Sequence, residues 1–492
     1  MDQDRRDFLR NSVRVGALAF AGAALGRPGT APAEGAPGNE LARMTLIELS
    51  RLLASQKITS RQLVEQSLAA IKDPQGEGSR TFLLVHDAAA LAAADRVDAL
   101  RRGGSKLPEL AGIPLSIKDL FDEASFTTLG GSRVLVGTPP AARDCTVVER
   151  LRRAGAIIVG RTNLVEFAYS GLGINPHYGT PRNVFDRVAG RIPGGSSSGA
   201  AISVTDGMAA GAIGSDTGGS VRIPAALNGL VGFKPTARRV PLDGVLPLSF
   251  TLDSAGPIGK TVADCALLDK ILAAEAGRVP EPARLGGLRF AVPKTVFQAE
   301  LSPAVADAFA KALALLSAAG AKIVELPMAE FALAAAINPR GALTSAEAYA
   351  WHRQWLKDGA DKYDPRVLSR IRGGEKTLAA DYLDLIRLRE RFVRAINAAA
   401  AGYDAMLMPT TPETAPTIAE ASKDDESYSR LNGRMLRNPA VVNLFDGCAL
   451  SVPCHDPGSA PVGLMIAGVQ NTDRKILAIG LAVEAVVSKR GG

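Results

Sequence analysis

Residues 190–201 read GRIPGGSSSGAA, and this run decides how the rest of the chain is interpreted. Runs of glycine and serine usually form flexible linkers, because glycine admits nearly every backbone conformation and serine is well solvated. Here the run is bounded by Pro193 and by an alanine-rich apolar segment, and the chain does not change character across it. The context therefore favours a tightly folded loop over a spacer.

The composition describes an ordinary globular protein with a large core. Of the 492 residues, 47% are hydrophobic and 22% are charged. The net charge of +7 is spread along the chain without a dense basic block, which argues against a nucleic-acid partner. The four cysteines lack CxxC spacing and there are four histidines, so neither a metal nor another cofactor is expected. Cys448 and Cys454 flank a predicted strand and are expected to be buried thiols rather than a disulfide.

The N-terminus carries a separate signal. Arg5 and Arg6 open RRDFLR, an apolar stretch VGALAFAGAALG follows, and the small-residue sequence APA ends at Ala33. This pattern predicts a twin-arginine export signal over residues 1–33 and a flexible stretch over 34–40. The apolar stretch is shorter than the roughly 20 residues that span a bilayer, so no stable membrane span is expected. The interpretation is a bacterial protein that is periplasmic or secreted.

The chain from residue 41 to 492 is predicted to form a single domain in which strands and helices alternate. Residues 302–320 have helical periodicity ending at Gly320. This alternation indicates an α/β fold with one large mixed, twisted sheet covered by helices on both faces. Residues 330–440 are predominantly helical in pattern and predict an insertion over the active-site face. Three short apolar runs are typical of buried strands, namely GIPLSIKD at 112–119, AIIVGRTNL at 156–164 and LRFAVPK at 288–294.

Two glycine-framed serines mark the middle of the chain. Ser196 lies in GGSSSGAA, and Ser220 lies in GSDTGGSVRIPA. These segments resemble the signature region of the amidase signature family of serine hydrolases. GLVGFKPT, the GIPLSIKD run around Lys118, LSVPC and PVGLMIAG resemble further segments of that family. The resemblance covers about residues 41–488, and its motifs are highly specific in combination.

The resemblance implies a Ser-Ser-Lys triad with Ser220 as nucleophile, Ser196 as bridging serine and Lys118 as proton acceptor. It also implies a cis peptide bond before Ser196. A serine hydroxyl is a weak nucleophile until a base takes its proton, and a lysine is a base only while neutral. Lys118 lies between the apolar runs IPLSI and LF, where burial lowers the pKa of a lysine. We therefore expect Lys118 to be buried.

The loop around the nucleophile is expected to stabilise the charge of a tetrahedral intermediate. Glycines in DTGGS allow the chain to turn so that backbone N–H groups converge on one point. The predicted donors are the N–H groups of Thr217, Gly218, Gly219 and Ser220. The residues expected to support the loop are Asp216, Arg222 and Ser197.

Other polar residues receive secondary roles. Tyr169 and Ser170 in EFAYSGLG match a family segment that lies close to the active site, so they are possible pocket residues. His177 and His352 are alternative general bases, but the lysine makes a histidine base unnecessary. Packing or pocket-lining roles are therefore predicted for both histidines.

Several functions remain open at this level. The first is an amidase that hydrolyses a carboxamide C–N bond to a carboxylate and an amine or ammonia through an acyl-enzyme. A urea-derivative hydrolase of the allophanate or biuret type shares the triad. The A subunit of a tRNA-dependent amidotransferase works in the cytoplasm with other chains, contrary to the export signal. A non-catalytic binding protein is disfavoured because all three triad residues are present.

The substrate and the assembly are the least determined features. Residues 325–440 combine apolar and aromatic side chains with scattered arginines. Pockets of that composition enclose apolar groups, so an aryl or medium-sized apolar amide is predicted as the small-molecule substrate. The alternative is that these residues only pack against the sheet. A monomer or a homodimer is expected.

Overall fold

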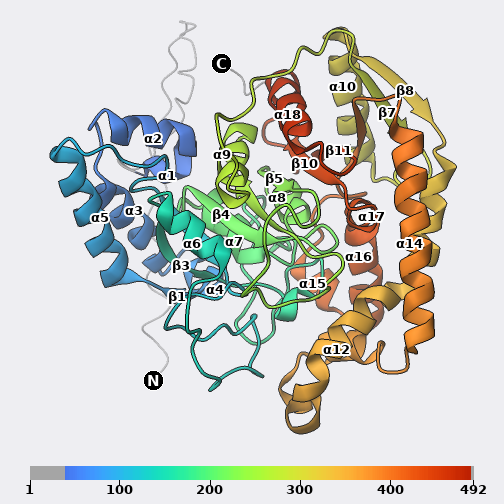
Figure 1. Ribbon diagram of the computed structural model, residues 1–492, viewed down its shortest axis with the longest axis horizontal. Helices are drawn as coiled ribbons and strands as arrows, with labels where there is room; N and C mark the ends of the chain where they lie inside the picture. The colour runs from blue at the N-terminus through green and yellow to red at the C-terminus, as the bar shows by residue number, and fades with distance from the viewer. Residues whose placement is uncertain (1–38, 489–492) are drawn as a thin grey trace, which may run out of the picture. The chain divides into compact units, whose positions relative to one another are not determined.

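The computed structural model describes residues 39–488, so the predicted export signal lies outside the described residues. The described chain forms a sheet of eleven strands (Figure 1). The strands are β1 (Phe82–Val85), β2 (Pro114–Lys118), β3 (Ile157–Thr162), β4 (Gly211–Ser215), β5 (Val231–Lys234), β6 (Ala255–Gly259), β7 (Arg289–Pro293), β8 (Lys322–Leu326), β9 (Ala405–Pro409), β10 (Cys448–Pro453) and β11 (Gly463–Gly468).

The helices that accompany the sheet begin at Glu40, one residue before the predicted start of the domain. The α-helices are α1 (Glu40–Arg43), α2 (Leu46–Ala54), α3 (Ser60–Lys72), α4 (Gly78–Thr81), α5 (Asp87–Arg102), α6 (Thr146–Arg153), α7 (Ser198–Thr205), α8 (Arg222–Leu227), α9 (Val262–Leu272), α10 (Pro303–Ala318), α11 (Ala334–Ile337), α12 (Ala342–Gly359), α13 (Pro365–Arg372), α14 (Ala379–Ala400), α15 (Ile418–Ser422), α16 (Asp425–Arg437), α17 (Pro439–Leu444) and α18 (Asp473–Val487). The 3-10 helices are η2 (Glu166–Ala168), η3 (Ala329–Leu333), η4 (Pro339–Gly341) and η5 (Ala360–Lys362).

The sheet is mixed, as the sequence predicts. Its spatial order is β1-β3-β2-β4-β6-β5-β10-β11-β9-β7-β8. Strand β2 pairs in parallel with β3 and β4, whereas β10 pairs antiparallel with β5 and β11. The first six strands in this order come from residues 82–259 and the last five from residues 289–468. The β5–β10 pairing therefore joins these two parts of the chain into one sheet.

Helices cover both faces of the sheet because side chains alternate along the strands. On β10 and β11 one set of apolar side chains packs with α9, α10 and α18, and the alternate set packs with α14 and α17. The first set comprises Leu450, Val452, Leu464 and Ile466, and the second comprises Ala449, Met465 and Ala467. Figure 1 shows α18 (red) beside these strands and α10 (yellow) toward β7 and β8.

The same alternation on β2 orients the predicted base. Leu115 and Ile117 point into a core that also contains residues of α2 and α9. Ser116 and Lys118 point to the opposite face, where the Ser116 hydroxyl lies 2.8 Å from that of Ser203 on α7. The alternation of β2 therefore directs Lys118 toward the loop that precedes α7.

The predicted helical insertion over residues 330–440 differs from the structure. Helices α11 to α14 follow one another there, but β9 comes next and belongs to the sheet. Strand β9 pairs antiparallel with β11 and parallel with β7. Its five residues, AMLMP, are too few to interrupt a helical pattern in the sequence. The segment is therefore two helical stretches separated by a sheet strand.

Candidate active site

Lys118 and Ser196 are in direct contact. The Nζ atom of Lys118, the last residue of β2, lies 2.7 Å from the Ser196 hydroxyl and 2.8 Å from the Ser215 hydroxyl at the end of β4. Lys118 and Ser196 are fully buried. The Gly195–Ser196 peptide bond is cis, as the family resemblance implies. The amine therefore has two hydroxyl partners, of which the sequence predicts one.

Ser220 adjoins this pair through the backbone. The N–H of Ser197 donates to the carbonyl oxygen of Ser220 at 3.3 Å, and the Ser197 hydroxyl donates to the Ser215 carbonyl at 3.3 Å. Ser220 is 3% exposed. Within residues 39–488, no hydrogen bond joins the hydroxyls of Ser196 and Ser220. The Ser197 side chain packs directly against Gly214. A Cβ on residue 214 would lie 2.6 Å from the Ser197 Oγ, so the glycine is needed for this contact.

Burial gives Lys118 the protonation behaviour of a base. Loss of water lowers the pKa of Lys118 to about 7, although the carboxylates of Asp253 and Asp216 oppose the shift. Near neutral pH a large share of this amine is therefore uncharged. An uncharged amine in contact with a serine hydroxyl is able to accept its proton.

Asp216 and Arg222 form a buried ion pair in the loop that carries Ser220. The fully buried guanidinium of Arg222 donates to both carboxylate oxygens of Asp216 at 2.9 and 3.0 Å. Burial by itself favours a raised pKa for Asp216, but Arg222 outweighs it and holds that pKa well below its usual range. Arg222 also donates to the Asn443 side-chain oxygen at 2.7 Å, and Asn443 donates to the Asp216 carbonyl at 3.0 Å.

The predicted oxyanion donors are not equivalent. The N–H of Gly219 donates to Asp216 Oδ1 at 2.7 Å, so the carboxylate already occupies it. In the described part of the chain, no hydrogen bond uses the N–H groups of Thr217, Gly218 or Ser220. Gly219 has a φ of +122°, and a Cβ there would lie 2.5 Å from Pro439. Gly219 therefore shapes the loop. The N–H groups of Thr217, Gly218 and Ser220 stay available to a ligand.

Asp253 is a buried carboxyl group that no sequence motif identified. It accepts a hydrogen bond from the Thr217 hydroxyl and further bonds from the N–H groups of Leu248 and Ser249 at 2.9 and 3.0 Å. Burial raises the pKa of Asp253 to about 6. Ser215 ends β4 and Asp253 lies two residues before β6, so they come together only when β4 and β6 pair, and no local pattern identifies their roles.

The two possible pocket residues, Tyr169 and Ser170, directly follow η2. The Tyr169 hydroxyl is 2.8 Å from that of Ser345 on α12, and the Arg370 guanidinium lies 4.2 Å from the centre of the Tyr169 ring. Ser170 donates to the side-chain oxygen of Asn432 on α16 at 3.0 Å. Both residues are buried. They join the Tyr169–Ser170 segment to the helices of the second half of the chain.

The histidines have contacts that fit packing roles. His177 Nε2 lies 2.9 Å from Glu166 Oε1. The buried His352 has its Nδ1 2.9 Å from the Tyr363 hydroxyl, and its ring meets Phe167 edge to face with 4.4 Å between centres. Burial lowers the pKa of His352 to about 3. Among residues 39–488 of the chain, no hydrogen bond, ion pair or ring contact joins either histidine to Lys118, Ser196 or Ser220.

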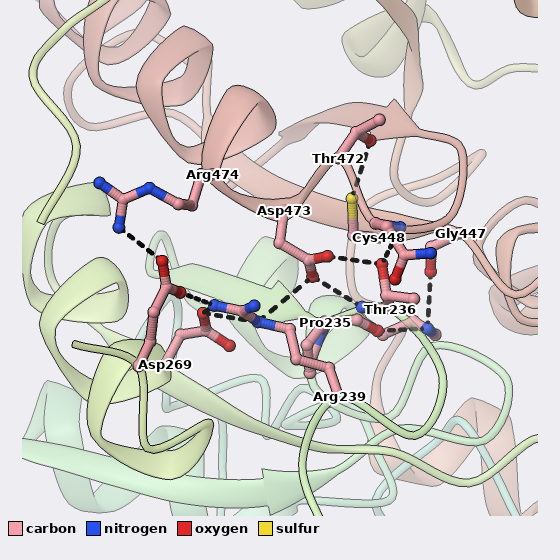
Figure 2. Close-up of polar contacts among 12 residues, drawn as sticks. Pro235, Thr236, Arg239, Asp269, Gly447, Cys448, Thr472, Asp473 and Arg474 are labelled. Carbon is pink, nitrogen blue, oxygen red and sulfur yellow. Dashed lines mark hydrogen bonds and ion pairs between the residues drawn. The ribbon is translucent and has the colours of Figure 1, made fainter.

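The GLVGFKPT motif has a structural task (Figure 2). Lys234 Nζ donates to the carbonyl oxygens of Pro235 and Gly447 at 2.7 and 2.8 Å, which ties β5 to the start of β10. The Thr236 hydroxyl and N–H both donate to Asp473, at 2.6 and 2.8 Å, at the beginning of α18. Cys448 lies beside this network as a free buried thiol, and Cys454 is also free and buried, as predicted.

Two further findings concern residues 39–488. No group of three or more His, Cys, Asp or Glu side chains in this range is placed to hold a metal ion. Among the helices described there, none combines the length and the apolar character required to cross a membrane.

Known proteins are similar to this chain over most of its length. A family model described as Amidase matches residues 62–477. A 2-amino-5-chloromuconic acid deaminase of Comamonas testosteroni is 36% identical over 91% of this chain and 97% of its own. A mandelamide hydrolase of Pseudomonas putida is 33% identical over 91% of this chain and 92% of its own.

The similarity also extends to a solved structure. A structure described as an amidase superposes with a TM-score of 0.81 and 32% identity, covering 90% of this chain and all of the other. The matched motifs, the mixed sheet and this coverage together show that the chain belongs to the Amidase family.

Proposed function

We propose that this protein hydrolyses a carboxamide C–N bond with Ser220 as nucleophile, Ser196 as bridging serine and Lys118 as base. The observation that carries the proposal is the buried amine of Lys118, which contacts the Ser196 hydroxyl and has a pKa of about 7. A group that is uncharged near neutral pH and bonded to a serine is suited to proton abstraction.

The reaction proceeds in two steps, acylation and deacylation of Ser220. Ser196 gives its proton to Lys118 and takes the proton of Ser220 as the Ser220 oxygen bonds to the amide carbon. The proton held by Lys118 then passes through Ser196 to the amide nitrogen as the C–N bond breaks, which releases an amine or ammonia and leaves an ester on Ser220. Water attacks that ester and gives a proton through Ser196 to Lys118, and that proton passes to the Ser220 oxygen as the ester bond breaks, which frees the acid and restores the Ser220 hydroxyl. The N–H groups of Thr217, Gly218 and Ser220 are the donors proposed for the oxyanion.

The substrate proposed is an aryl or medium-sized apolar amide. The surroundings of the nucleophile loop support it, since a Cβ on Gly218 would lie 3.5 Å from Leu436 Cδ2 and 3.6 Å from Ala440 Cβ. Apolar walls favour apolar acyl or amine groups. Mandelamide, the compound in the name of one relative, is an aromatic carboxamide. Twin-arginine export is part of the proposal and depends on the Arg5–Arg6 segment alone.

The decisive experiment compares Ser220→Ala with Ser105→Ala, a control that removes an exposed hydroxyl from the loop after α5. Product release from benzamide, acetanilide, a peptide C-terminal amide, propionamide, glutamine and biuret is measured on the purified protein. We expect the wild type and Ser105→Ala to cleave an aromatic amide fastest, and folded Ser220→Ala to cleave none. Turnover by Ser220→Ala contradicts the mechanism, and faster cleavage of glutamine or biuret contradicts the substrate class.

A further inference from the structure

Phe250 is a large apolar side chain presented to solvent on the loop that precedes β6. It is 63% exposed, whereas Ser249 is fully buried and Leu252 is 3% exposed. The backbone N–H groups of Leu252 and Asp253 donate to the Ser249 carbonyl oxygen at 3.2 and 3.0 Å, which closes a tight turn. No sequence motif predicted a role for this turn.

The buried carboxylate of Glu347 holds the turn from one side. Glu347 lies on α12 and accepts hydrogen bonds from the hydroxyls of Ser249 and Thr251 and, at 3.1 Å, from the Thr251 N–H. Tyr382 of α14 donates to the same carboxylate at 2.7 Å. Both polar neighbours of Phe250 are thus turned inward, and the ring is the part of the turn left facing water.

The carboxyl group of Asp253 ties the turn to the nucleophile loop. It accepts from the N–H groups of Leu248 and Ser249 and also from the Thr217 hydroxyl, three residues before Ser220. The backbone of Ser254 exchanges hydrogen bonds with that of Asp216 at 2.7 and 3.1 Å. The position of Phe250 is therefore fixed relative to the loop that carries the nucleophile.

Helix α12 relates the turn to the possible pocket segment. Glu347 holds the Phe250 turn, and Ser345, two residues earlier on the same helix, contacts the Tyr169 hydroxyl. The Phe250 turn and the Tyr169 segment thus adjoin the same stretch of α12. Leu436 and Ala440 lie beside Gly218 and give the nucleophile loop apolar neighbours.

We propose that Phe250 is a specificity-determining residue that packs against the aryl or apolar group of the amide substrate. The inference rests on the proposed amide hydrolysis and extends it to a named contact. Aromatic rings attract one another in offset or edge-to-face geometry beyond the gain from buried area. Two buried carboxyl groups hold the turn that carries the ring, so little backbone freedom is lost when a substrate covers the ring, and contact with it favours binding.

The test uses Phe250→Ala in the full-length protein, with Phe250→Tyr as the conservative variant. Leu100→Ala is the matched control, because Leu100 is 50% exposed and lies on α5, in the part of the chain with β1 and α3 (Figure 1). The readout is kcat/KM for benzamide and for acetanilide, each divided by kcat/KM for propionamide. The benzamide ratio measures the preference for an aryl group on the acyl part of the amide. The acetanilide ratio measures the preference for an aryl group on the amine that leaves.

We expect Phe250→Ala to lower at least one ratio about tenfold, while Phe250→Tyr and Leu100→Ala stay within about twofold of the wild type. If Phe250→Ala changes both the benzamide ratio and the acetanilide ratio by less than twofold, the proposal is overturned. If turnover of all amides depends on Ser220 while these ratios do not change, the inference about Phe250 fails and the proposed function stands.

A binding measurement keeps the test independent of turnover. Calorimetry compares the affinity of Ser220→Ala and of Ser220→Ala/Phe250→Ala for benzamide and acetanilide, after circular dichroism shows that both are folded. An increase of about tenfold in Kd for either compound supports the contact. Equal Kd values, or no binding to either protein, overturn it.

Discussion

Replacing Ser215 by alanine removes one of the two hydroxyl partners of the Lys118 amine. The bond from Nζ to the Ser215 Oγ is 2.8 Å long and buried. A hydrogen bond from an ammonium contributes about 1.5–3 kcal/mol, against about 0.5–1.5 kcal/mol for an uncharged donor. Ser215 thus favours charged Lys118 by about 1 kcal/mol, which corresponds to about 0.7 pKa unit.

The sign of the effect follows from which form is the base. The wild-type rate rises as pH increases through the Lys118 pKa of about 7, because only the neutral amine accepts a proton. Loss of Ser215 lowers that pKa further. The midpoint of the rising limb of kcat/KM therefore moves to lower pH by about 0.7 unit. The plateau at high pH falls, because the amine is no longer held in position against Ser196.

The assay is the pH profile of kcat/KM for an aromatic amide, at pH values where each protein stays folded. Ser215→Thr keeps a hydroxyl and is expected to restore the midpoint. Ser203→Ala is the matched control, since Ser203 is buried and bonded to Ser116 rather than to Lys118. With chemistry shown to be rate-limiting, a Ser215→Ala midpoint that stays in place or moves upward refutes the reasoning.

Two further predictions concern the bridging serine and the brace. Ser196→Ala breaks the proton path but keeps the nucleophile, so a trace of activity is expected in single-turnover assays, and full activity contradicts the bridging role. Arg222→Met leaves Asp216 charged and buried without its partner, which costs about 3–5 kcal/mol of unfolding free energy in urea titrations. Arg153→Ala, which breaks an exposed pair with Glu149, is the control and costs less than about 1 kcal/mol. Equal losses for the two arginine variants contradict the bracing role.

Local patterns were enough to predict several of the strands and one long helix. The apolar runs around Lys118 and Phe290 are buried strands, and the helix predicted to end at Gly320 ends at Ala318, with Gly320 at a φ of +93°. These features depend on residues close in sequence, which is why periodicity and glycine position reveal them. The predicted 330–440 insertion is not confirmed as one helical segment, because β9 joins the sheet within it, and a five-residue strand between helices is too short to change the sequence pattern.

The sequence by itself determined the family resemblance, the alternation that buries Lys118 and the glycines that let the nucleophile loop turn. Only the tertiary structure decided that Ser215 shares the amine with Ser196, that Asp216 occupies the N–H of Gly219, and that Asp253 and Glu347 fix the turn of Phe250. Each of these contacts depends on where a side chain points after strands or helices distant in sequence have packed. Hydrogen bonding and desolvation act over a few ångströms, so their outcome is set by that packing and not by neighbouring residues in the chain.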